Sequence, residues 1–180
     1  MSIAFELCNE RLGYNGSKVL DGVTLRIREG ERVALVGKSG AGKSTLLKRL
    51  FEQRRTDSAI IPQELGLVRP LSLFHNVYMG RLNAHAIWYN LANLVRPMQR
   101  EVAAVQQVAS RLGLSEDKLF ERVGELSGGQ QQRTAVARAI YQEAEILLGD
   151  EPVSSVDGRQ SRVVLDNIND AYATAVLSMH

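Results

Sequence analysis

The sequence has 180 residues, of which 44% are hydrophobic and 23% are charged, and this profile excludes collagen-like and disordered chains. The 22 Lys and Arg residues nearly balance the 20 Asp and Glu residues, so the net charge of +2 gives no support for a nucleic-acid partner. The single Cys8 excludes an intramolecular disulfide framework, and no apolar run approaches the ~18 residues of a membrane span. We therefore expect a soluble, single-domain protein without a signal peptide that inserts no segment of its own into a membrane.

The first third of the chain predicts strands followed by a helix. Apolar residues alternate with polar ones in Ile3–Leu7 and in Val23–Ile27, which is typical of half-buried strands. After a turn at Glu29–Glu31, the run Val33–Val36 is apolar at every position. Such a run predicts a central parallel strand that is covered on both faces. A helix is expected from Lys43 onward.

The rest of the chain alternates helix and strand signals around a long helical stretch. Residues 72 to 145 carry almost no strand pattern and include apolar residues at helical spacing in Val102–Leu112. Strands are expected at Ala59–Ile61, Ile146–Leu148 and Ala175–Leu177, and helices from Ser127 and across Val164–Tyr172. These elements predict an α/β protein with a parallel sheet and a mostly helical insert.

Residues Gly37–Ser44 match the phosphate-binding loop pattern, in which two glycines frame four residues and Lys-Ser follows. Glycines let the backbone N–H groups curl around phosphates without Cβ clashes, and the helix that follows points its N-terminus at the anion. In this pattern Lys43 reaches the β- and γ-phosphates, and the Ser44 hydroxyl binds Mg²⁺.

An acidic pair, Asp150-Glu151, directly follows the apolar run Ile146–Leu148. Carboxylates at the C-terminal end of a strand lie beside the nucleotide crevice of an open α/β sheet. We expect Asp150 to hold Mg²⁺ through water and Glu151 to act as general base on the attacking water.

The motif Leu126-Ser127-Gly128-Gly129-Gln130 precedes a predicted helix, where Ser127 could also serve as an ordinary N-cap. With the loop at Gly37–Ser44 and the acidic pair, it stands in the order found in ATP-binding-cassette (ABC) ATPases. The whole chain resembles that family. The resemblance implies a P-loop NTPase with a RecA-like parallel core, an N-terminal antiparallel β part and a helical subdomain inserted at about 72–131.

The resemblance also implies the site residues. Catalytic roles fall to Glu151, His180 and Gln63, and Mg²⁺ would be held by Ser44, Gln63 and Asp150. In the family an aromatic residue stacks on adenine at the position of Tyr14, and the signature grips the γ-phosphate bound to a second subunit. The residues assigned to ATP are Tyr14, Gly37, Lys38, Ser39, Gly40, Ala41, Gly42, Lys43, Ser44, Thr45, Ser127, Gly128, Gly129 and Gln130.

The same resemblance implies partners and a cytoplasmic setting. A head-to-tail dimer of two ATPase subunits, expected to be identical copies, would bind two ATP molecules and drive membrane permease subunits from the inner face of the cell membrane. The segments Arg122–Arg133 and Asn76–Pro97 look like ATPases of phosphonate-type importers. An alternative is a nucleotide-gated, dimerising regulatory protein with little turnover.

Two departures from the family bear on these expectations. The segment between Ser44 and Gln63 is shorter than in the family, so the antiparallel part should be reduced. The chain stops at His180, where the family continues with another strand and helices, so this histidine should be poorly positioned.

Three further features have simpler interpretations. Cys8 should be a small residue that is buried or half-buried. The stretch Ile87–Leu91 with Leu94-Val95 could be a membrane-active helix, but it is too short and too weakly charged for that, so it should belong to the core or contact a partner. Phe74–Met79 could either dock a permease helix or simply pack.

Overall fold

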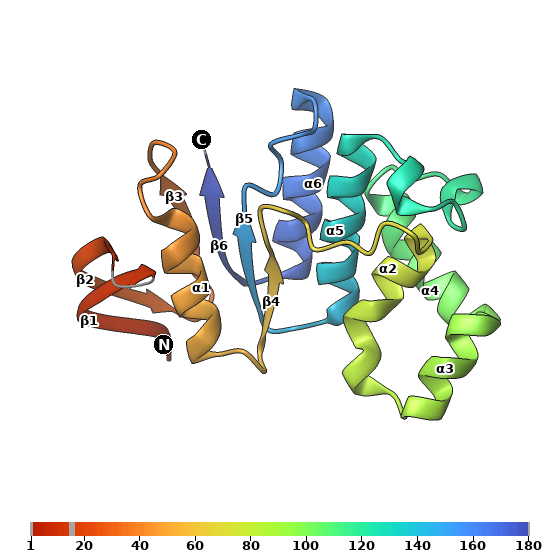
Figure 1. Ribbon diagram of the computed structural model, residues 1–180, viewed down its shortest axis with the longest axis horizontal. Coiled ribbons are helices and arrows are strands. Elements are labelled where there is room, and N and C mark those ends of the chain that lie inside the picture. The colour runs from red at the N-terminus through yellow and green to blue at the C-terminus, as the bar shows by residue number, and fades with distance from the viewer. Residues whose placement is uncertain (1, 15–16, 180) are drawn as a thin grey trace. The chain divides into compact units, whose positions relative to one another are not determined.

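The computed structural model describes residues 2–14 and 17–179, and the chain divides into two compact units (Figure 1). Unit 1 comprises Met1–Gln63, Ala144–Pro152 and Tyr172–His180, and unit 2 comprises Glu64–Glu143 and Val153–Ala171. Each unit is therefore assembled from segments that lie far apart in the sequence.

Unit 1 is built on a parallel four-stranded sheet with the order β3-β6-β5-β4. The strands are β3 (Arg32–Val36), β4 (Ser58–Ile61), β5 (Ile146–Asp150) and β6 (Thr174–Met179), and helix α1 (Lys43–Gln53) connects β3 to β4. Strand β5 is buried along its whole length between β4 and β6. The predicted strands and the α/β class are confirmed.

The expectation that Val33–Val36 is a central strand is wrong. Strand β3 lies at the edge of the sheet and pairs only with β6 among the described strands, for example Val33 with Val176. Its residues alternate between exposed and partly buried, and Val36 is 77% exposed. A continuous apolar run does not by itself require cover on both faces, because strand order is set by the whole sheet.

A long antiparallel hairpin completes unit 1, formed by β1 (Ile3–Tyr14) and β2 (Ser17–Arg28). Its inward side chains Phe5, Leu7 and Ile27 join the core that α1 covers with Leu47 and Leu50. The predicted alternation holds from Phe5 to Leu7 but is broken at the start of β1, where Ile3 is 45% exposed and Ala4 is buried. Cys8 is exposed, so the expectation of a buried or half-buried residue is wrong. Among the described strands, this hairpin is the whole antiparallel sheet.

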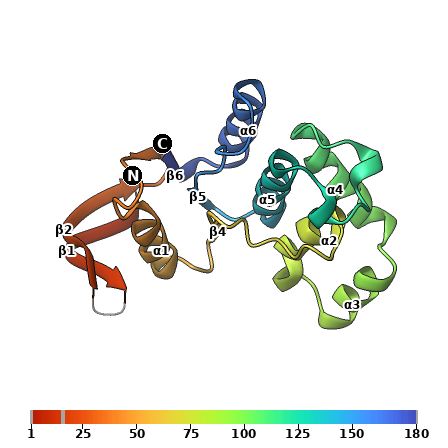
Figure 2. The same cartoon turned by 45° about the horizontal axis from the view of Figure 1, so that its top comes forward.

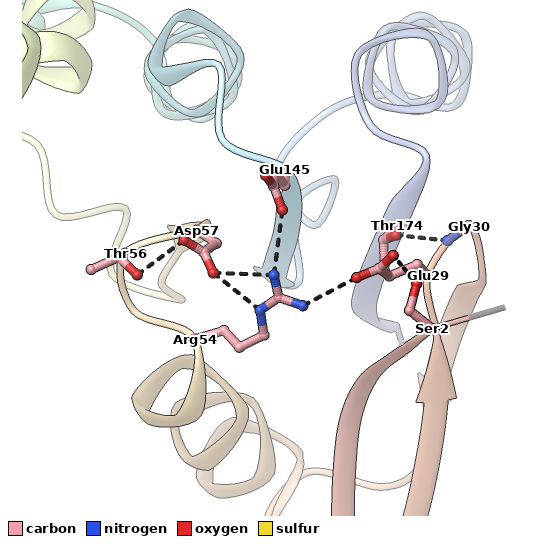
Figure 3. A network of polar contacts seen from close by, with 8 residues as sticks. All are labelled: Ser2, Glu29, Gly30, Arg54, Thr56, Asp57, Glu145 and Thr174. Atoms are coloured by element: carbon pink, nitrogen blue, oxygen red, sulfur yellow. Dashed lines mark hydrogen bonds and ion pairs between the residues drawn. The ribbon is translucent and has the colours of Figure 1, made fainter.

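Arg54, just after α1, links the base of the hairpin to the starts of two sheet strands (Figure 3). Its guanidinium contacts Asp57 at 3.1 Å, Glu145 at 3.3 Å and Glu29 at 3.5 Å. Glu29 also accepts a hydrogen bond from Ser2. One partly buried cation thus joins four segments of unit 1. Burial is the largest single influence on the pKa of Arg54 and lowers it, but the neighbouring carboxylates together outweigh burial, so the pKa is raised.

Unit 2 is helical, as the sequence predicts. Its helices are α2 (Leu73–Tyr78), α3 (Ile87–Val95), α4 (Gln99–Arg111), α5 (Gly128–Gln142) and α6 (Gly158–Ala171), with short 3-10 turns at Met79–Ala84, Glu116–Lys118 and Val123–Glu125. Helices α2, α4 and α6 all pack against α5. Phe74, Val77 and Tyr78 are buried in this packing, as the packing alternative expects.

Of the two expectations for helix α3, a place in the core or contact with a partner, the structure contradicts the first. Trp88 and its apolar neighbours on this helix are largely exposed, and α3 lies at the margin of the unit 2 helices in both views (Figure 1, Figure 2). Throughout residues 2–14 and 17–179, every helix is too short or too polar to span a bilayer.

Candidate functional site: a glycine loop and an acidic pair

The loop between β3 and α1 has the backbone that its glycines permit. Gly40 and Gly42 have φ angles of 79° and 88°, in the left-handed region that other residues avoid. A Cβ atom on Gly42 would lie 2.7 Å from Cγ of Leu20 on β2, so a side chain has no room there. Gly42 is the N-cap of α1 and makes no side-chain capping bond, which leaves the first N–H groups of the helix for another acceptor.

Lys43 opens α1 and turns its ammonium group toward the loop. Its Nζ donates hydrogen bonds to the carbonyl oxygens of Gly37 at 2.6 Å and Lys38 at 3.3 Å. These bonds hold a positive charge beside the left-handed glycines. The loop therefore presents both backbone donors and a cation, the combination that binds phosphate.

A pocket of about 320 Å³ opens over this loop, within the range of small-ligand sites, roughly 300 to 1,000 Å³. It brings the glycine loop together with Gln63, which follows β4, and with Glu151, which follows β5. Its lining is Val19, Ser39, Gly40, Ala41, Gly42, Lys43, Ser44, Thr45, Gln63 and Glu151. Every one of these residues except Val19 was selected from the sequence as a site residue, so one cavity gathers most of the expected unit 1 site.

The acidic pair is oriented by a serine on the neighbouring strand. The Ser178 hydroxyl on β6 donates to Oδ1 of buried Asp150 at 2.6 Å and accepts from the Glu151 backbone N–H at 3.0 Å. Glu151 has a φ of 52°, so the chain turns sharply as it leaves β5 and the Glu151 side chain reaches the pocket. Ser178 was not among the expected site residues, although a polar side chain inside the apolar run Ala175–Met179 is a signal that could have identified it.

The donor set suits a hard divalent cation. Ser44, Gln63 and Asp150 offer hydroxyl, amide and carboxylate oxygens, and Mg²⁺ prefers such ligands together with water and substrate phosphates. Within residues 2–14 and 17–179 no three His, Cys, Asp or Glu side chains form a ready-made metal cluster. Ser44 and Gln63 line the pocket, whereas Asp150 is bonded to Ser178 and is not part of the pocket lining.

The Ser127–Gln130 motif lies in unit 2, where it starts α5. The Ser127 hydroxyl accepts from the Gln130 N–H at 3.3 Å, and Gln130 Oε1 accepts from the Ser127 N–H at 2.9 Å. This is a complete capping box. A Cβ on Gly128 would meet no atom within 4 Å, whereas one on Gly129 would lie 3.1 Å from the Ser155 carbonyl oxygen.

Buried Gln132 holds the segment after the acidic pair against α5. Its Oε1 accepts from the Ser155 N–H at 2.6 Å, and its Nε2 donates to the Ser154 hydroxyl at 3.3 Å. Gln132 was not expected to have a role, because a polar residue on a predicted helix gives no sign that it is buried. The contact ties the Ser127–Gln130 helix to the Ser154–Asp157 segment within unit 2.

Arg138 plays a similar part for the segment that follows Gln63. Its guanidinium donates to the carbonyl oxygens of Leu65 and Gly66, both at 2.7 Å, and burial lowers its pKa. Both residues have positive φ angles, 59° for Leu65 and 57° for Gly66. The cation thus stabilises an irregular turn on the face of α5.

Two expected site residues fall outside the described side chains. The backbone of Tyr14 pairs with Ser17 at the end of the hairpin, but the Tyr14 side chain lies outside the described part of the structure. His180 also lies outside the described residues.

Comparison with known proteins agrees with this geometry. Residues 20–154 match the family model described as ABC transporter. The phosphonates import ATP-binding protein PhnC of Anaeromyxobacter dehalogenans (strain 2CP-C) is 39% identical, over 93% of this chain and 38% of the relative. PhnC of Escherichia coli O157:H7 is 33% identical, over 97% of this chain and 79% of the relative.

A solved structure supports the fold independently. The dimeric structure of MJ0796, a bacterial ABC transporter cassette, aligns with a TM-score of 0.79 and 24% identity, covering 97% of this chain and 87% of that chain. The present chain spans less than half the length of the Anaeromyxobacter relative and about four fifths of the Escherichia one. On the match to residues 20–154 and the identity over nearly the whole chain, the protein belongs to the ABC transporter family.

Proposed function

We propose that this chain is the ATP-binding and ATP-hydrolysing subunit of an ABC importer for phosphonate or a related small solute. The observation that carries the proposal is the unit 1 pocket, where the glycine loop, Gln63 and Glu151 line one cavity. Relatives named as phosphonates import proteins, at 33% and 39% identity, support the choice of solute.

In the proposed site the loop N–H groups and Lys43 bind the phosphates of ATP. The Lys43 ammonium would exchange its bonds to the Gly37 and Lys38 carbonyls for phosphate oxygens, at little cost in reorganisation because it already lies at the loop. Ser44, Gln63 and Asp150 would hold Mg²⁺, which neutralises phosphate charge when bound.

Glu151 acts as the general base in this proposal. Its backbone is fixed by Ser178, so the carboxylate is presented to the pocket by a rigid strand end. It would accept a proton from the attacking water while the γ-phosphoryl group is transferred. We further propose that Tyr14 stacks on adenine and that His180 contacts the γ-phosphate, in keeping with the family resemblance.

The working unit would be a pair of such chains bound to permease subunits at the inner face of the cell membrane. The chain would form one cassette, with residues of about 72–131 as the helical subdomain. In the pair, Ser127–Gln130 of each copy would contact the nucleotide held by the other. ATP binding would close the pair and hydrolysis would reopen it, because the γ-phosphate contacts are lost.

The test is ATP turnover by the purified chain and by Glu151→Gln. We expect this substitution to lower kcat by about 10² to 10⁴-fold, the usual contribution of a general base, while ATP binding is retained. The matched control is Glu116→Gln, an exposed carboxylate of unit 2 that should leave turnover unchanged. Equal turnover in Glu151→Gln and wild type would contradict the assignment. A wild-type chain that binds ATP and dimerises without releasing phosphate would favour the regulatory alternative.

A further inference from the structure

The chain makes a strained turn directly after Gln63. Leu65 has a φ of 59° and Gly66 a φ of 57°, so two consecutive residues take the left-handed conformation. The Gly66 N–H donates to the Glu64 carbonyl oxygen at 2.7 Å, which closes a three-residue turn around Leu65. A turn of this kind with a positive φ at its centre is rare, and a leucine there is strained. Such strain persists only where the surrounding structure imposes it.

Arg138 on α5 holds this turn. Its Nη2 donates to the Leu65 carbonyl oxygen and its Nη1 to that of Gly66, both at 2.7 Å. Burial lowers the pKa of Arg138, and no carboxylate in the described part of the chain pairs with it to offset this effect. The two carbonyl groups of the turn therefore take the place of a counter-ion. A planar guanidinium can bond both of them at once, which a lysine cannot do.

The chain beyond the turn is fixed as well. Asn76 on α2 is fully buried, and its Oδ1 accepts from the Val68 N–H at 2.8 Å. Its Nδ2 donates to the carbonyl oxygens of Val68, Leu71 and Ser72. Two N–H groups of the 3-10 turn Val123–Glu125 donate to further carbonyl oxygens of this segment, at 2.9 Å and 3.0 Å. Unit 2 thus holds the segment at several points, so a change in the turn is not absorbed there.

The chain before the turn is short. Strand β4 ends at Ile61, which is paired with β5, and Gln63 then lines the glycine-loop pocket. Three residues, Pro62, Gln63 and Glu64, separate the end of this strand from the turn, and the proline ring fixes its own φ. A span with so few free dihedral angles has little room to absorb a change in the direction of the chain. The conformation at Leu65 therefore bears on where Gln63 can point.

We propose that Arg138 is a positioning residue for Gln63, and that it acts by holding the Leu65–Gly66 turn. This role rests on the proposed function, in which Gln63 is a ligand of Mg²⁺ in the nucleotide site. Arg138 itself binds neither ATP nor Mg²⁺ and works through the path of the backbone. When its two bonds are lost, the left-handed turn is no longer imposed, and the Gln63 amide is presented to the pocket less often.

The test is equilibrium binding of a non-hydrolysable ATP analogue, with Mg²⁺ and with a chelator in its place, at a chain concentration low enough to prevent pairing. The ratio of the two affinities is the Mg²⁺-dependent gain. We expect Gln63→Ala to lower this gain, and Arg138→Lys to lower it at least about threefold. Affinity in the chelator should stay as in the wild type, because the glycine loop is unchanged in both variants.

A double-variant cycle separates positioning from a general structural role. If Arg138 acts through Gln63, Arg138→Lys should have no further effect on the Mg²⁺-dependent gain in a chain that already carries Gln63→Ala. An effect of the same size with and without the Gln63 side chain would overturn the inference.

Two substitutions at Leu65 test the turn without touching α5, and they also serve if Arg138→Lys does not fold. Valine is branched at Cβ and is strongly disfavoured at a positive φ, so Leu65→Val should lower the Mg²⁺-dependent gain as Arg138→Lys does. Glycine accepts this conformation freely, so Leu65→Gly should retain the gain although it removes the whole side chain. Equal losses in both variants would assign the effect to side-chain packing and contradict the proposal.

The matched control is Arg133→Lys. Arg133 lies on the same helix and also donates to two carbonyl oxygens, those of Leu112 and Gly113, both at 3.1 Å, and Gly113 has a φ of 69°. Arg133→Lys should leave the Mg²⁺-dependent gain unchanged even if it lowers Tm, because the gain is a ratio in which a general loss of affinity cancels. A loss of gain equal to that of Arg138→Lys would count against a role specific to the turn.

The outcomes also separate this role from the proposed function. A wild-type chain that binds no nucleotide would overturn the proposed function and this role with it. A wild-type gain that is lost in Gln63→Ala but kept in Arg138→Lys and in Leu65→Val would overturn the role of Arg138 alone. Circular dichroism of each variant confirms that unit 2 remains folded.

Discussion

Helices α1 and α5 begin in opposite ways, although both follow motifs that resemble phosphate-binding segments. Helix α1 starts at Gly42 in the left-handed conformation with no side-chain cap. Helix α5 starts at Ser127, whose side chain and that of Gln130 satisfy two N–H groups of the first turn. One helix start is therefore left open, and the other is closed by its own residues.

Under the proposed function, this difference predicts that the two motifs meet a nucleotide in different ways. At α1 the donors need no rearrangement to meet an anion, which lowers the cost of binding. At α5 the capping box stabilises unit 2 in the absence of nucleotide, and an incoming phosphate must use other N–H groups or compete with Gln130. The start of α1 thus leaves its N–H groups open to a ligand, whereas the Ser127–Gln130 motif stabilises the start of its own helix.

The strongest test of this contrast is Gly42→Ala against Gly128→Ala. We expect Gly42→Ala to lower the free energy of unfolding by about 1–3 kcal/mol, because of the left-handed φ and the clash with Leu20, and to weaken ATP binding at least about tenfold. Denaturant unfolding and equilibrium nucleotide binding measure the two effects. Gly128→Ala should leave stability unchanged or raise it by up to ~1 kcal/mol, because a Cβ meets open space in a helix. Equal losses of ATP binding in both variants would erase the contrast.

The other end of α5 offers a second test, at Tyr141. Burial raises the pKa of Glu101, but hydroxyls donated by Tyr141 at 2.6 Å and Tyr89 at 2.9 Å outweigh it and hold that pKa below its ordinary value of 4.5. A lowered folded-state pKa stabilises the protein above the unfolded value, and this stability is lost as the pH falls through the folded value. Tyr141→Phe should therefore lower the free energy of unfolding by about 1.5–3 kcal/mol at neutral pH, and by less once Glu101 is protonated.

Chemical unfolding of wild type and Tyr141→Phe at neutral and at acid pH measures this difference. Tyr172→Phe, at another buried tyrosine whose pKa is raised by burial, is the matched control. A loss in Tyr141→Phe that stays the same from neutral to acid pH would show that the bond to the Glu101 carboxylate is not its cause.

The smallest expected effect is that of Ser127→Ala against Ser44→Ala, in the absence of nucleotide. Removing the Ser127 cap should cost about 1 kcal/mol, or roughly 2–4 °C in Tm for a chain of this size. Ser44 supplies no cap to α1, so Ser44→Ala should leave Tm unchanged and weaken only Mg²⁺-dependent ATP binding. Thermal unfolding distinguishes them, and an equal drop in Tm for both variants would refute the distinction between the two helix starts.

The sequence predicted the elements well where a local signal determines them. The phosphate-loop pattern, the helical spacing of Val102–Leu112 and the alternation in β1 are such signals, and each element is present. The Ser127 cap was also foreseen as an ordinary helix start, and the structure adds its reciprocal bond from Gln130.

The errors occurred where distant partners decide the outcome. The run Val33–Val36 looks the same in a central strand and in an edge strand, and only the order β3-β6-β5-β4 distinguishes them. The apolar residues of α3 have the spacing of a buried stripe. The side of α3 that faces inward depends on Glu101 and Tyr78, which form hydrogen bonds with the polar side of this helix. A local sequence pattern does not reveal these partners.

The strand order of unit 1 also constrains the sequence of events during synthesis. When the ribosome has made β3 and β4, neither strand has a sheet neighbour, because β6 pairs with β3, β5 pairs with β4, and both emerge only after Glu64–Glu143. During this time the edges of β3 and β4 remain unpaired and exposed. The helices of the insert have more local contacts, so they can already form. A nascent chain arrested before Ile146 should accordingly protect the α4 and α5 region from protease and depend on chaperones to keep β3 and β4 from aggregating.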